Sequence, residues 1–378
     1  MSAIRPLEPG DVRNVAALWQ YWFRDKTLDP DPDLVDLVRR IYLEHPSRAE
    51  GVNPLVAVGS AGALQGFLGV TVTPLIVDGR PETLAGVFPS VLAPDAPTAV
   101  ASLLLRTFLA GPQALSFSDG GHVRFERIWE TLGGRIAQLQ SLRWVKLFRP
   151  ASVGAEAVTG GSRRVLLPLI APLAAGVDWL ARLMARERLT GEPPRALPAG
   201  RPSLRLTGEP LTPPTLLEAN GLLHRGLRLQ PEYDDAYLTW LFAEFARIRG
   251  LGDLRATLVR DPSGGIAGWY VAFLNPQRVS RVFALEASGR HLDAVVDHLF
   301  AQADAAGVGA LIGRLTPQLR RPMAARGCLI HAGGSLQMVH ARDQTLLDDV
   351  ELGRAALSRL DGENWFWWDI ANRGDAPM

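Results

Sequence analysis

This sequence has little lysine, little cysteine and almost no net charge. Of its 378 residues 40 are basic and 39 are acidic, so the formal net charge is +1, and Lys26 and Lys146 are the only lysines. This balance argues against a strongly basic nucleic-acid-binding surface. Its single cysteine, Cys328, excludes an internal disulfide bond and any metal site built from several cysteines.

Signals for export or membrane insertion are also scarce. Residues 1–13 contain no apolar core of signal-peptide length, so we expect a cytoplasmic protein. The apolar segment Val165–Ala185 is interrupted by two prolines and by Asp178 and Arg182. Because charges in lipid are costly, we predict that this segment is a helix packed between domains and not a membrane span. Contact with a membrane surface is the alternative.

The chain has enough apolar residues for a packed core, with a hydrophobic content of 47%, and its length allows two or three domains. Its composition changes over residues 151–202, whose ends are rich in glycine, proline and alanine. We therefore predict a domain over 1–150, a linker with a helical segment over 151–202, and a second domain over 203–378.

The order of elements is the same in both predicted domains. A strand, two helices and three antiparallel strands are followed by a helix, a strand, a helix and a final strand. In the first domain the later elements are Leu84–Val91, Thr98–Leu109, Ala114–Ser118, Val123–Leu132 and the long strand Ile136–Phe148. The pattern predicts an α+β protein with two domains, each a mixed, mostly antiparallel central sheet flanked by helices. We expect one sheet within Ile4–Phe148 and the other within Leu204–Trp368, with the aromatic run from Trp365 plugging the second core.

The loop before the helix at Thr98 directs backbone N–H groups, and the positive end of a helix dipole, at one spot. Such a spot suits a phosphate group. The counterpart in the second domain is the loop Ser288–His291, which precedes the helix predicted over His291–Ala305.

Two segments of the first predicted domain resemble a known family. Ile4–Leu7 and Asp11 are similar to the usual start of the GCN5-related N-acetyltransferase (GNAT) superfamily, and Arg127–Gly134 is similar to its late helix, which ends in a Leu-Gly-aromatic motif. The second copy makes the whole chain resemble a tandem protein of that superfamily. The resemblance implies transfer of an acyl group from acetyl-CoA or another acyl-CoA to a small-molecule amine, with the pyrophosphate held by the loop after the fourth strand.

The first loop departs from the family pattern Gln/Arg-x-x-Gly-x-Gly/Ala. Asp95 brings a negative charge, Pro97 has no N–H to donate, and no glycine is present. Thr98 and Ala99 remain candidate contacts to the cofactor. Trp129 stands where a tyrosine commonly protonates the leaving thiolate.

The second loop keeps more of the required chemistry. Ser288, Gly289, Arg290 and His291 supply a glycine and a basic residue at the start of a helix. We therefore predict that these four residues form the better cofactor site, although the same residues also make an ordinary helix entry.

Three residues are candidates for acid–base catalysis. Glu286, at a predicted strand end, is a candidate base for an ammonium substrate, or else a carboxylate stabilised by the helix dipole. Asp119 and His122 flank the corresponding strand end of the first domain, either as an acid–base pair or as parts of a turn and cap. No metal site is expected, since His224 and the other histidines show no metal-ligand spacing.

The predicted function is therefore N-acyl transfer to an amine. The alternative is a non-catalytic binding or scaffold protein on the same fold, which the altered first loop and the missing tyrosine favour. A third possibility is resemblance to the peptidoglycan aminoacyl transferases, which use aminoacyl-tRNA, but the near-neutral charge and scarce lysine argue against it. The oligomeric state is left open.

Overall fold

The computed structural model of this protein describes residues 2–121, 123–150, 206–276, 278–332, 335–362 and 365–366. The predicted linker helix Val165–Ala185 and the candidate His122 lie outside these ranges. Among the described residues, no helix combines the length and the apolar character needed to cross a membrane.

The first part of the chain alternates helices with strands in the predicted order. Asp31 and Pro32 open α2 as expected for a cap followed by proline at the first helical position. The elements are β1 (Ala3–Pro6), η1 (Pro9–Asp11), α1 (Val12–Trp19), η2 (Gln20–Arg24), α2 (Pro32–Tyr42), β2 (Leu55–Val58), β3 (Leu64–Val77), β4 (Arg80–Leu92), α3 (Ala99–Leu109), β5 (Leu115–Gly121), α4 (Val123–Thr131), β6 (Arg135–Ile136), α5 (Gln138–Ser141) and β7 (Leu142–Leu147).

The second part also begins with a strand and helices followed by three antiparallel strands, but it has an additional strand, β9, between its first two helices and ends in β14, β15 and α12. Helix α9 is capped by Asp234, whose side chain accepts a hydrogen bond from the backbone N–H of Tyr237. The elements are β8 (Thr207–Pro210), α8 (Pro213–Leu223), β9 (Leu229–Pro231), α9 (Asp235–Arg247), β10 (Asp253–Arg260), β11 (Ile266–Leu274), β12 (Val279–Ala287), α10 (Leu292–Ala305), β13 (Ala310–Arg314), α11 (Arg320–Ala325), β14 (Leu329–Ala332), β15 (Leu336–His340) and α12 (Gln344–Glu351).

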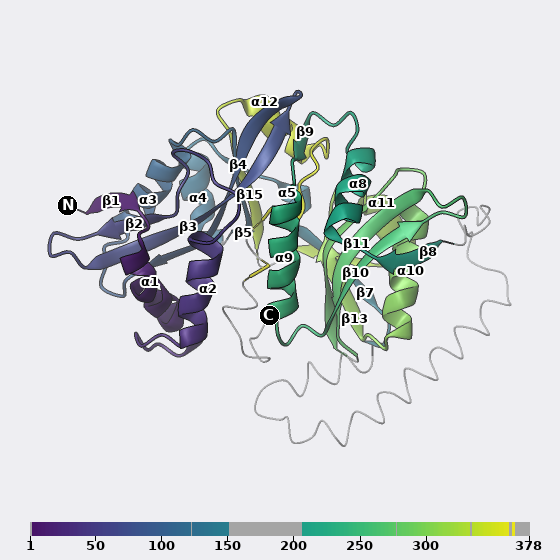
Figure 1. Cartoon of the computed structure of the whole chain (residues 1–378), viewed down its shortest axis with the longest axis horizontal. Helices are drawn as coiled ribbons and strands as arrows, with labels where there is room; N and C mark the ends of the chain where they lie inside the picture. Colours follow the sequence, from purple (N-terminus) through teal and green to yellow (C-terminus); the bar gives the residue numbers. More distant parts are fainter. Residues whose placement is uncertain are drawn as a thin grey trace, which may run out of the picture.

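The strands form two mixed sheets that lie side by side in Figure 1. The first has the order β1-β2-β3-β4-β5-β15-β6, with β9 paired to β3, and the second has the order β14-β7-β13-β12-β11-β10-β8. Each contains a set of antiparallel strands and one parallel pair, β4 with β5 and β12 with β13. The predicted α+β fold with two mostly antiparallel sheets is thus confirmed.

The two parts of the chain exchange strands, which the sequence analysis did not predict. The single strand expected over Ile136–Phe148 is broken by α5, so β6 stays in the first sheet while β7 pairs with β13 and β14 in the second. Strand β15 makes the opposite crossing and pairs with β5 and β6. The expectation that each sheet is built within its own part of the chain is therefore wrong. A strand can pair with any neighbour that lets its alternating side chains match the buried and exposed faces of the sheet. In the second sheet, β7 buries Trp144 beside Phe300.

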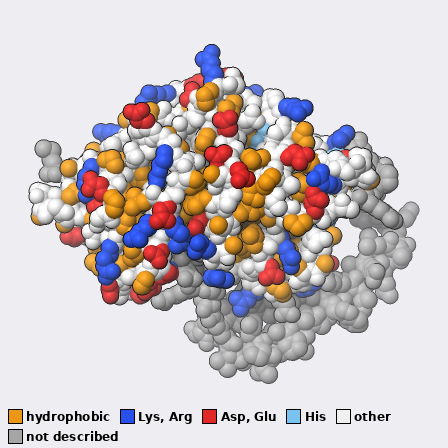
Figure 2. Space-filling view, in the orientation of Figure 1, with side chains coloured by type: hydrophobic (Ala, Val, Ile, Leu, Met, Phe, Trp, Pro, Cys, Tyr) orange, Lys and Arg blue, Asp and Glu red, His pale blue; other side chains and the backbone are white. Residues whose placement is uncertain are grey.

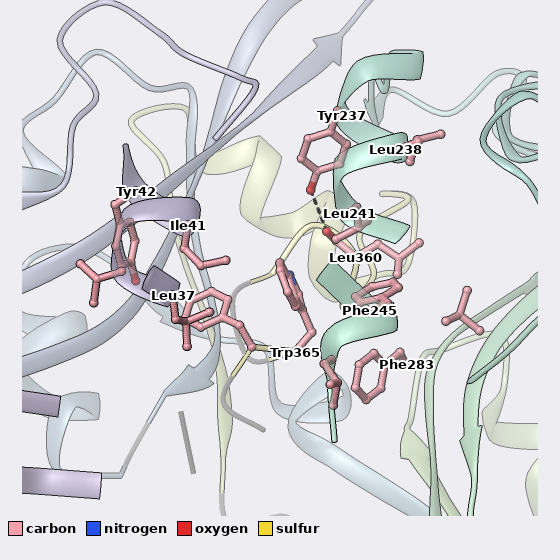
Figure 3. Packing of buried hydrophobic residues seen from close by; sticks show 14 of the residues in the cluster. Leu37, Ile41, Tyr42, Tyr237, Leu238, Leu241, Phe245, Phe283, Leu360 and Trp365 are labelled. Carbon is pink, nitrogen blue, oxygen red and sulfur yellow. Dashed lines mark hydrogen bonds between the residues drawn. The ribbon is translucent and has the colours of Figure 1, made fainter. Parts of the chain in front are cut away.

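A single apolar cluster joins the two parts between the sheets. Figure 3 shows α2 and α9 facing each other, with the ring of Trp365 between them. The labelled side chains are Leu37, Ile41 and Tyr42 on α2, Tyr237, Leu238, Leu241 and Phe245 on α9, and Phe283, Leu360 and Trp365. The aromatic run predicted to plug the second core instead contributes Trp365 and Phe366 to this shared cluster.

Both parallel strand pairs separate part-way along their length. Strands β4 and β5 pair from Leu84 and Leu115 as far as Gly86 and Phe117, and β12 and β13 pair from Val279 as far as Arg281. Each of β4 and β12 is also irregular beside its antiparallel neighbour, where the register shifts. Such a bulge bends the strand and re-aims its side chains. The separated ends leave backbone groups and side chains available for other contacts.

On the face of the molecule shown in Figure 2, acidic and basic side chains are interspersed, as the net charge of +1 leads one to expect.

Candidate active site

A cavity lies where β12 and β13 separate. Its volume is about 220 Å³, the size of a small organic group and not of a whole nucleotide cofactor. Its walls come from β12, from the end of β13, from the end of α8 and from the segment after α12. Glu286, His224, Arg314 and Arg359 are among the residues that line it.

An acid–base pair forms part of the cavity wall. His224 Nε2 donates a hydrogen bond to Glu286 Oε2, and the side chains are 5% and 21% exposed respectively. Glu286 is therefore the more accessible member of the pair. No described residue forms a hydrogen bond with its other oxygen, Oε1, so this atom can accept a proton from a molecule in the cavity.

Two further titratable groups lie close to this pair. Tyr233 donates its hydroxyl to Asp361, and Asp361 also accepts a hydrogen bond of 2.7 Å from the backbone N–H of Ser358. The carboxyl of Asp361 is 1% exposed. Ser358 lines the cavity, so Asp361 stands directly behind its wall.

The environment shifts the pKa of each of these groups. Burial raises the pKa of Asp361 to about 7, although the hydrogen bonds from Tyr233 and Ser358 oppose the shift, and repulsion from Glu286 adds to it. Burial lowers the pKa of His224, but attraction to Glu286 and the hydrogen bond between them outweigh burial, so this pKa is raised. Burial, followed by repulsion from Asp361, raises the pKa of Tyr233 well above its ordinary value. Such shifted groups beside a cavity are typical of acid–base sites.

The predicted cofactor loop of the second part, Ser288–His291, is a turn that leads into α10. Ser288 Oγ lies 3.1 Å from His291 Nδ1, and the His291 N–H donates to the Ser288 carbonyl at 2.8 Å. Open space surrounds Gly289, because a Cβ atom there would have no neighbour within 4 Å. Arg290 is 75% exposed and lies 3.9 Å from Asp261, whose carboxylate also faces His291. The loop is accessible, but a negative charge stands beside it.

In the first part, Thr98 and Ala99 are exposed at the start of α3, and the Thr98 side chain does not cap the helix. Asp119 is fully buried on β5, and the segment after α12 passes close to it, with Arg359 Nε 3.9 Å from its Oδ2. The structure therefore places Asp119 in an ion pair.

The whole chain is similar to solved structures of one fold. A conserved protein of unknown function from Enterococcus faecalis V583, described as a probable N-acyltransferase, matches over 94% of this chain and 74% of its own, with a TM-score of 0.57 and 10% identity. A GCN5-related N-acetyltransferase from Kribbella flavida matches over 90% and 72%, with a TM-score of 0.53 and 15% identity. Another, from Anabaena variabilis ATCC 29413, matches over 90% and 73%, with a TM-score of 0.57 and 11% identity.

The chain has the fold of the GCN5-related N-acetyltransferases. No protein-family profile matches the sequence, and no curated protein does either. The likeness therefore lies in the arrangement of elements and not in a shared sequence pattern.

Within this GCN5-related fold, β12 is the fourth of the strands β8, β10, β11 and β12, and the cavity opens directly beside it. Glu286, at the end of β12, was found from the sequence because a strand end before a helix is a recognisable pattern. His224 and Asp361 were missed as partners of this site. His224 is 62 residues from Glu286 in sequence, and no motif links them.

The tyrosine that the resemblance led us to seek is not on the late helix of the first part. Trp129 occupies that place, buried, with its indole N–H donating to the carbonyl of Val339 at 2.8 Å. Trp129 is thereby committed to packing α4 against β15. Tyr233, near the cavity of the second part, is the phenol that the structure brings close to Glu286.

Proposed function

We propose that this protein transfers an acyl group from an acyl-CoA to an amine at the cavity between β12 and β13. The observation that carries the proposal is the hydrogen-bonded pair of Glu286 and His224 in the wall of that cavity, next to a separated parallel strand pair. The GCN5-related fold supplies the reaction class only by likeness, so the chemistry rests on these two side chains.

In this proposal Glu286 Oε1 takes a proton from the ammonium group of the acceptor. The nitrogen lone pair then attacks the thioester carbonyl, the C–N bond forms and the C–S bond breaks. The amide nitrogen loses its second proton to the departing thiolate, which leaves as the thiol. His224 stabilises the carboxylate of Glu286 before the proton transfer and holds it in place, which is the role of an orienting partner.

The loop Ser288–His291 is the proposed contact for the diphosphate of the acyl-CoA. The first N–H groups of α10 have no partner within the helix, and the helix dipole is positive at this end. Arg290 supplies an exposed positive charge. Gly289 leaves room for close approach.

A non-catalytic binding protein is the second candidate. The observation in its favour is Asp261, whose carboxylate lies 3.8 Å from His291 and 3.9 Å from Arg290 and so opposes a diphosphate at this loop. In this case the cavity would hold a ligand that is not acylated.

Calorimetric titration with acetyl-CoA tests the proposal, and Gly289 offers a way to block the loop. A Cβ at Gly289 has no neighbour within 4 Å, so we expect Gly289→Leu to leave the free energy of unfolding unchanged while its side chain fills the space that a diphosphate needs. Gly10→Leu is the matched control, because a Cβ at Gly10 also has no neighbour within 4 Å and lies in the first part of the chain.

We expect the native protein and Gly10→Leu to bind acetyl-CoA equally, and Gly289→Leu to bind at least about tenfold more weakly, which corresponds to about 1.4 kcal/mol. Release of free thiol with an added amine then reports transfer. If neither acetyl-CoA nor a longer acyl-CoA binds, the non-catalytic candidate replaces the enzyme. If acetyl-CoA binds equally to all three proteins, the loop assignment is wrong.

A further inference from the structure

Four arginines gather between the two sheets, and two of them, Arg314 and Arg359, line the cavity. Arg314 on β13 lies directly opposite Arg143 on β7, and Arg281 on β12 is in register with Ile312, two residues before Arg314. Since side chains alternate along a strand and paired residues share a face, these three arginines project from the same face of the second sheet. Arg359, from the segment after α12, approaches the same place.

These arginines are held in a region of low exposure. Arg281 is 8% exposed and Arg359 is 7% exposed. Burial, followed by repulsion from Arg359 and Arg143, lowers the pKa of Arg281 to about 9. Burial also lowers the pKa of Arg359 and of Arg143. Gathering like charges away from water is unfavourable unless negative charge is brought to them.

Several of the contacts that these guanidinium groups make are with neutral acceptors. Arg314 donates to Gln337 Oε1 at 2.8 Å and to the carbonyl oxygen of Asp119, and Arg143 donates to Ser335 Oγ at 2.9 Å. Arg359 Nε finds no hydrogen-bond acceptor within the described part of the chain, and its ion pair with Asp119 spans 3.9 Å. That separation is too long for a hydrogen bond, so Arg359 retains the capacity to bind an anion.

The cavity connects this group to the proposed catalytic pair. Arg314 and Arg359 both line it, as do Glu286 and His224. A molecule in the cavity can therefore meet both a base and two guanidinium groups. Guanidinium groups bind carboxylate and phosphate through paired, charge-assisted hydrogen bonds.

We infer that the acceptor is a small amine that also carries an anionic group, a carboxylate or a phosphate, which Arg314 and Arg359 bind while the amine faces Glu286. The inference deepens the proposed acyl transfer and rests on it for the role of the amine. The binding of the anionic group does not depend on acyl-CoA, so it is measured without any acyl donor.

The first experiment measures the binding of three probes to the full chain by calorimetry: O-phosphoethanolamine, β-alanine and ethylamine. We expect one of the two anionic amines to bind at least about tenfold more tightly than ethylamine. A preference for O-phosphoethanolamine identifies a phosphate site, and a preference for β-alanine identifies a carboxylate site. Equal or undetectable binding of all three overturns the inference.

The second experiment replaces Arg359 and its ion-pair partner Asp119 in separate variants, which should change the affinity for the probe in opposite directions. Arg359→Gln should weaken binding of the preferred probe at least about tenfold. Asp119→Asn should tighten it, since the carboxylate that competes for Arg359 is removed. The control is Arg13→Gln, an arginine that is 68% exposed in an ion pair with Asp29. Circular dichroism and urea unfolding establish that each variant is folded.

The Asp119→Asn variant keeps the test decisive even if Arg359→Gln does not fold. Unchanged or weaker probe binding by folded Asp119→Asn indicates that the arginines only hold the two sheets together, and it overturns the inference. Probe binding without acyl transfer overturns the proposed reaction and leaves the anion site standing. Transfer to ethylamine as fast as to both anionic amines overturns the anion site and leaves the reaction standing.

Discussion

The parallel strand pairs β4–β5 and β12–β13 both separate part-way along their length, but different side chains lie beside them. Beside β4 the structure places aromatic packing: the ring of Phe366 lies 5.8 Å from that of Phe88 and stacks on Trp19, and the hydroxyl of Tyr42 donates to the Phe88 carbonyl. Between β12 and β13 it places a cavity with Glu286 in its wall. Aromatic side chains pack beside the first pair, and a cavity lies beside the second.

This difference indicates that the strand arrangement alone does not make a site. A separated strand pair exposes side chains and backbone groups, and their chemistry decides whether packing or binding follows. Aromatic rings contribute a large buried area, so the first opening adds to the core that joins both parts of the chain. The second opening carries the groups with shifted pKa values instead.

The largest expected effect comes from emptying the first opening. Phe366 is fully buried, so Phe366→Ala should lower the free energy of unfolding by about 3–5 kcal/mol, because it removes buried area and leaves a cavity. Urea unfolding measures this change. The control is Leu352→Ala, since Leu352 is 61% exposed and should change stability by no more than about 0.5 kcal/mol. Equal effects from both variants would mean that Phe366 does not hold the first opening shut.

The next largest effect concerns catalysis in the second opening. Glu286→Gln keeps the shape of the side chain but removes the base, so the rate of acyl transfer should fall about 100-fold or more. The matched control is Glu82→Gln on β4, the counterpart strand, where the side chain is exposed and the rate should not change. Steady-state thiol release measures both. A loss in the Glu82 variant as large as that in the Glu286 variant would place the chemistry in the first part.

Much of the fold follows from local sequence patterns. Asp31 and Pro32 before the apolar spacing of α2 are local signals of a helix start, and the glycine-rich turn between β10 and β11 is a local signal of a hairpin. The strand exchange was not found, because periodicity says which face of a strand is buried but not which neighbour it pairs with. Strand β7 fits the second sheet because of contacts such as Trp144 with Phe300, which are far apart in sequence.

The candidate site was predictable only where it lies within one short segment. Glu286 and Ser288–His291 are consecutive at a strand-to-helix junction, so their proximity was visible in the sequence. His224, Asp361 and Arg359 reach the cavity region from helix ends and loops elsewhere in the chain. No spacing rule connects them to Glu286, since tertiary packing alone brings them together.

A smaller effect compares the two loops that precede α3 and α10. Arg290→Ala should weaken acetyl-CoA binding about tenfold, since a charge-assisted contact contributes roughly 1.5–3 kcal/mol and exposure reduces it. Asp95→Ala in the first loop should leave binding unchanged. Calorimetric titration distinguishes them. If Arg290→Ala has no effect while Thr98→Pro abolishes binding, the cofactor belongs to the first loop.

The net effect expected to be smallest in the native protein is on the pH dependence of stability, because one group from each part of the chain acts in the opposite direction to the other. The folded state raises the pKa of Asp361 from 3.8 to about 7. Between these values the folded state keeps a proton that the unfolded state loses, so this group makes stability fall as pH rises. Burial lowers the pKa of His45 from 6.5 to about 4, and here the unfolded state binds the extra proton, so stability rises with pH.

In the native protein these two contributions oppose each other between about pH 4 and pH 6.5. Asp361→Asn removes the falling contribution, so the urea midpoint of this variant should rise more steeply with pH than that of the native chain. His45→Gln removes the rising contribution, so the urea midpoint of this variant should fall with pH relative to that of the native chain. Urea midpoints measured across this range, at constant ionic strength, give both slopes. Parallel profiles for Asp361→Asn and the native protein would show that Asp361 holds no extra proton in the folded state, and that the wall behind Glu286 is charged throughout this pH range.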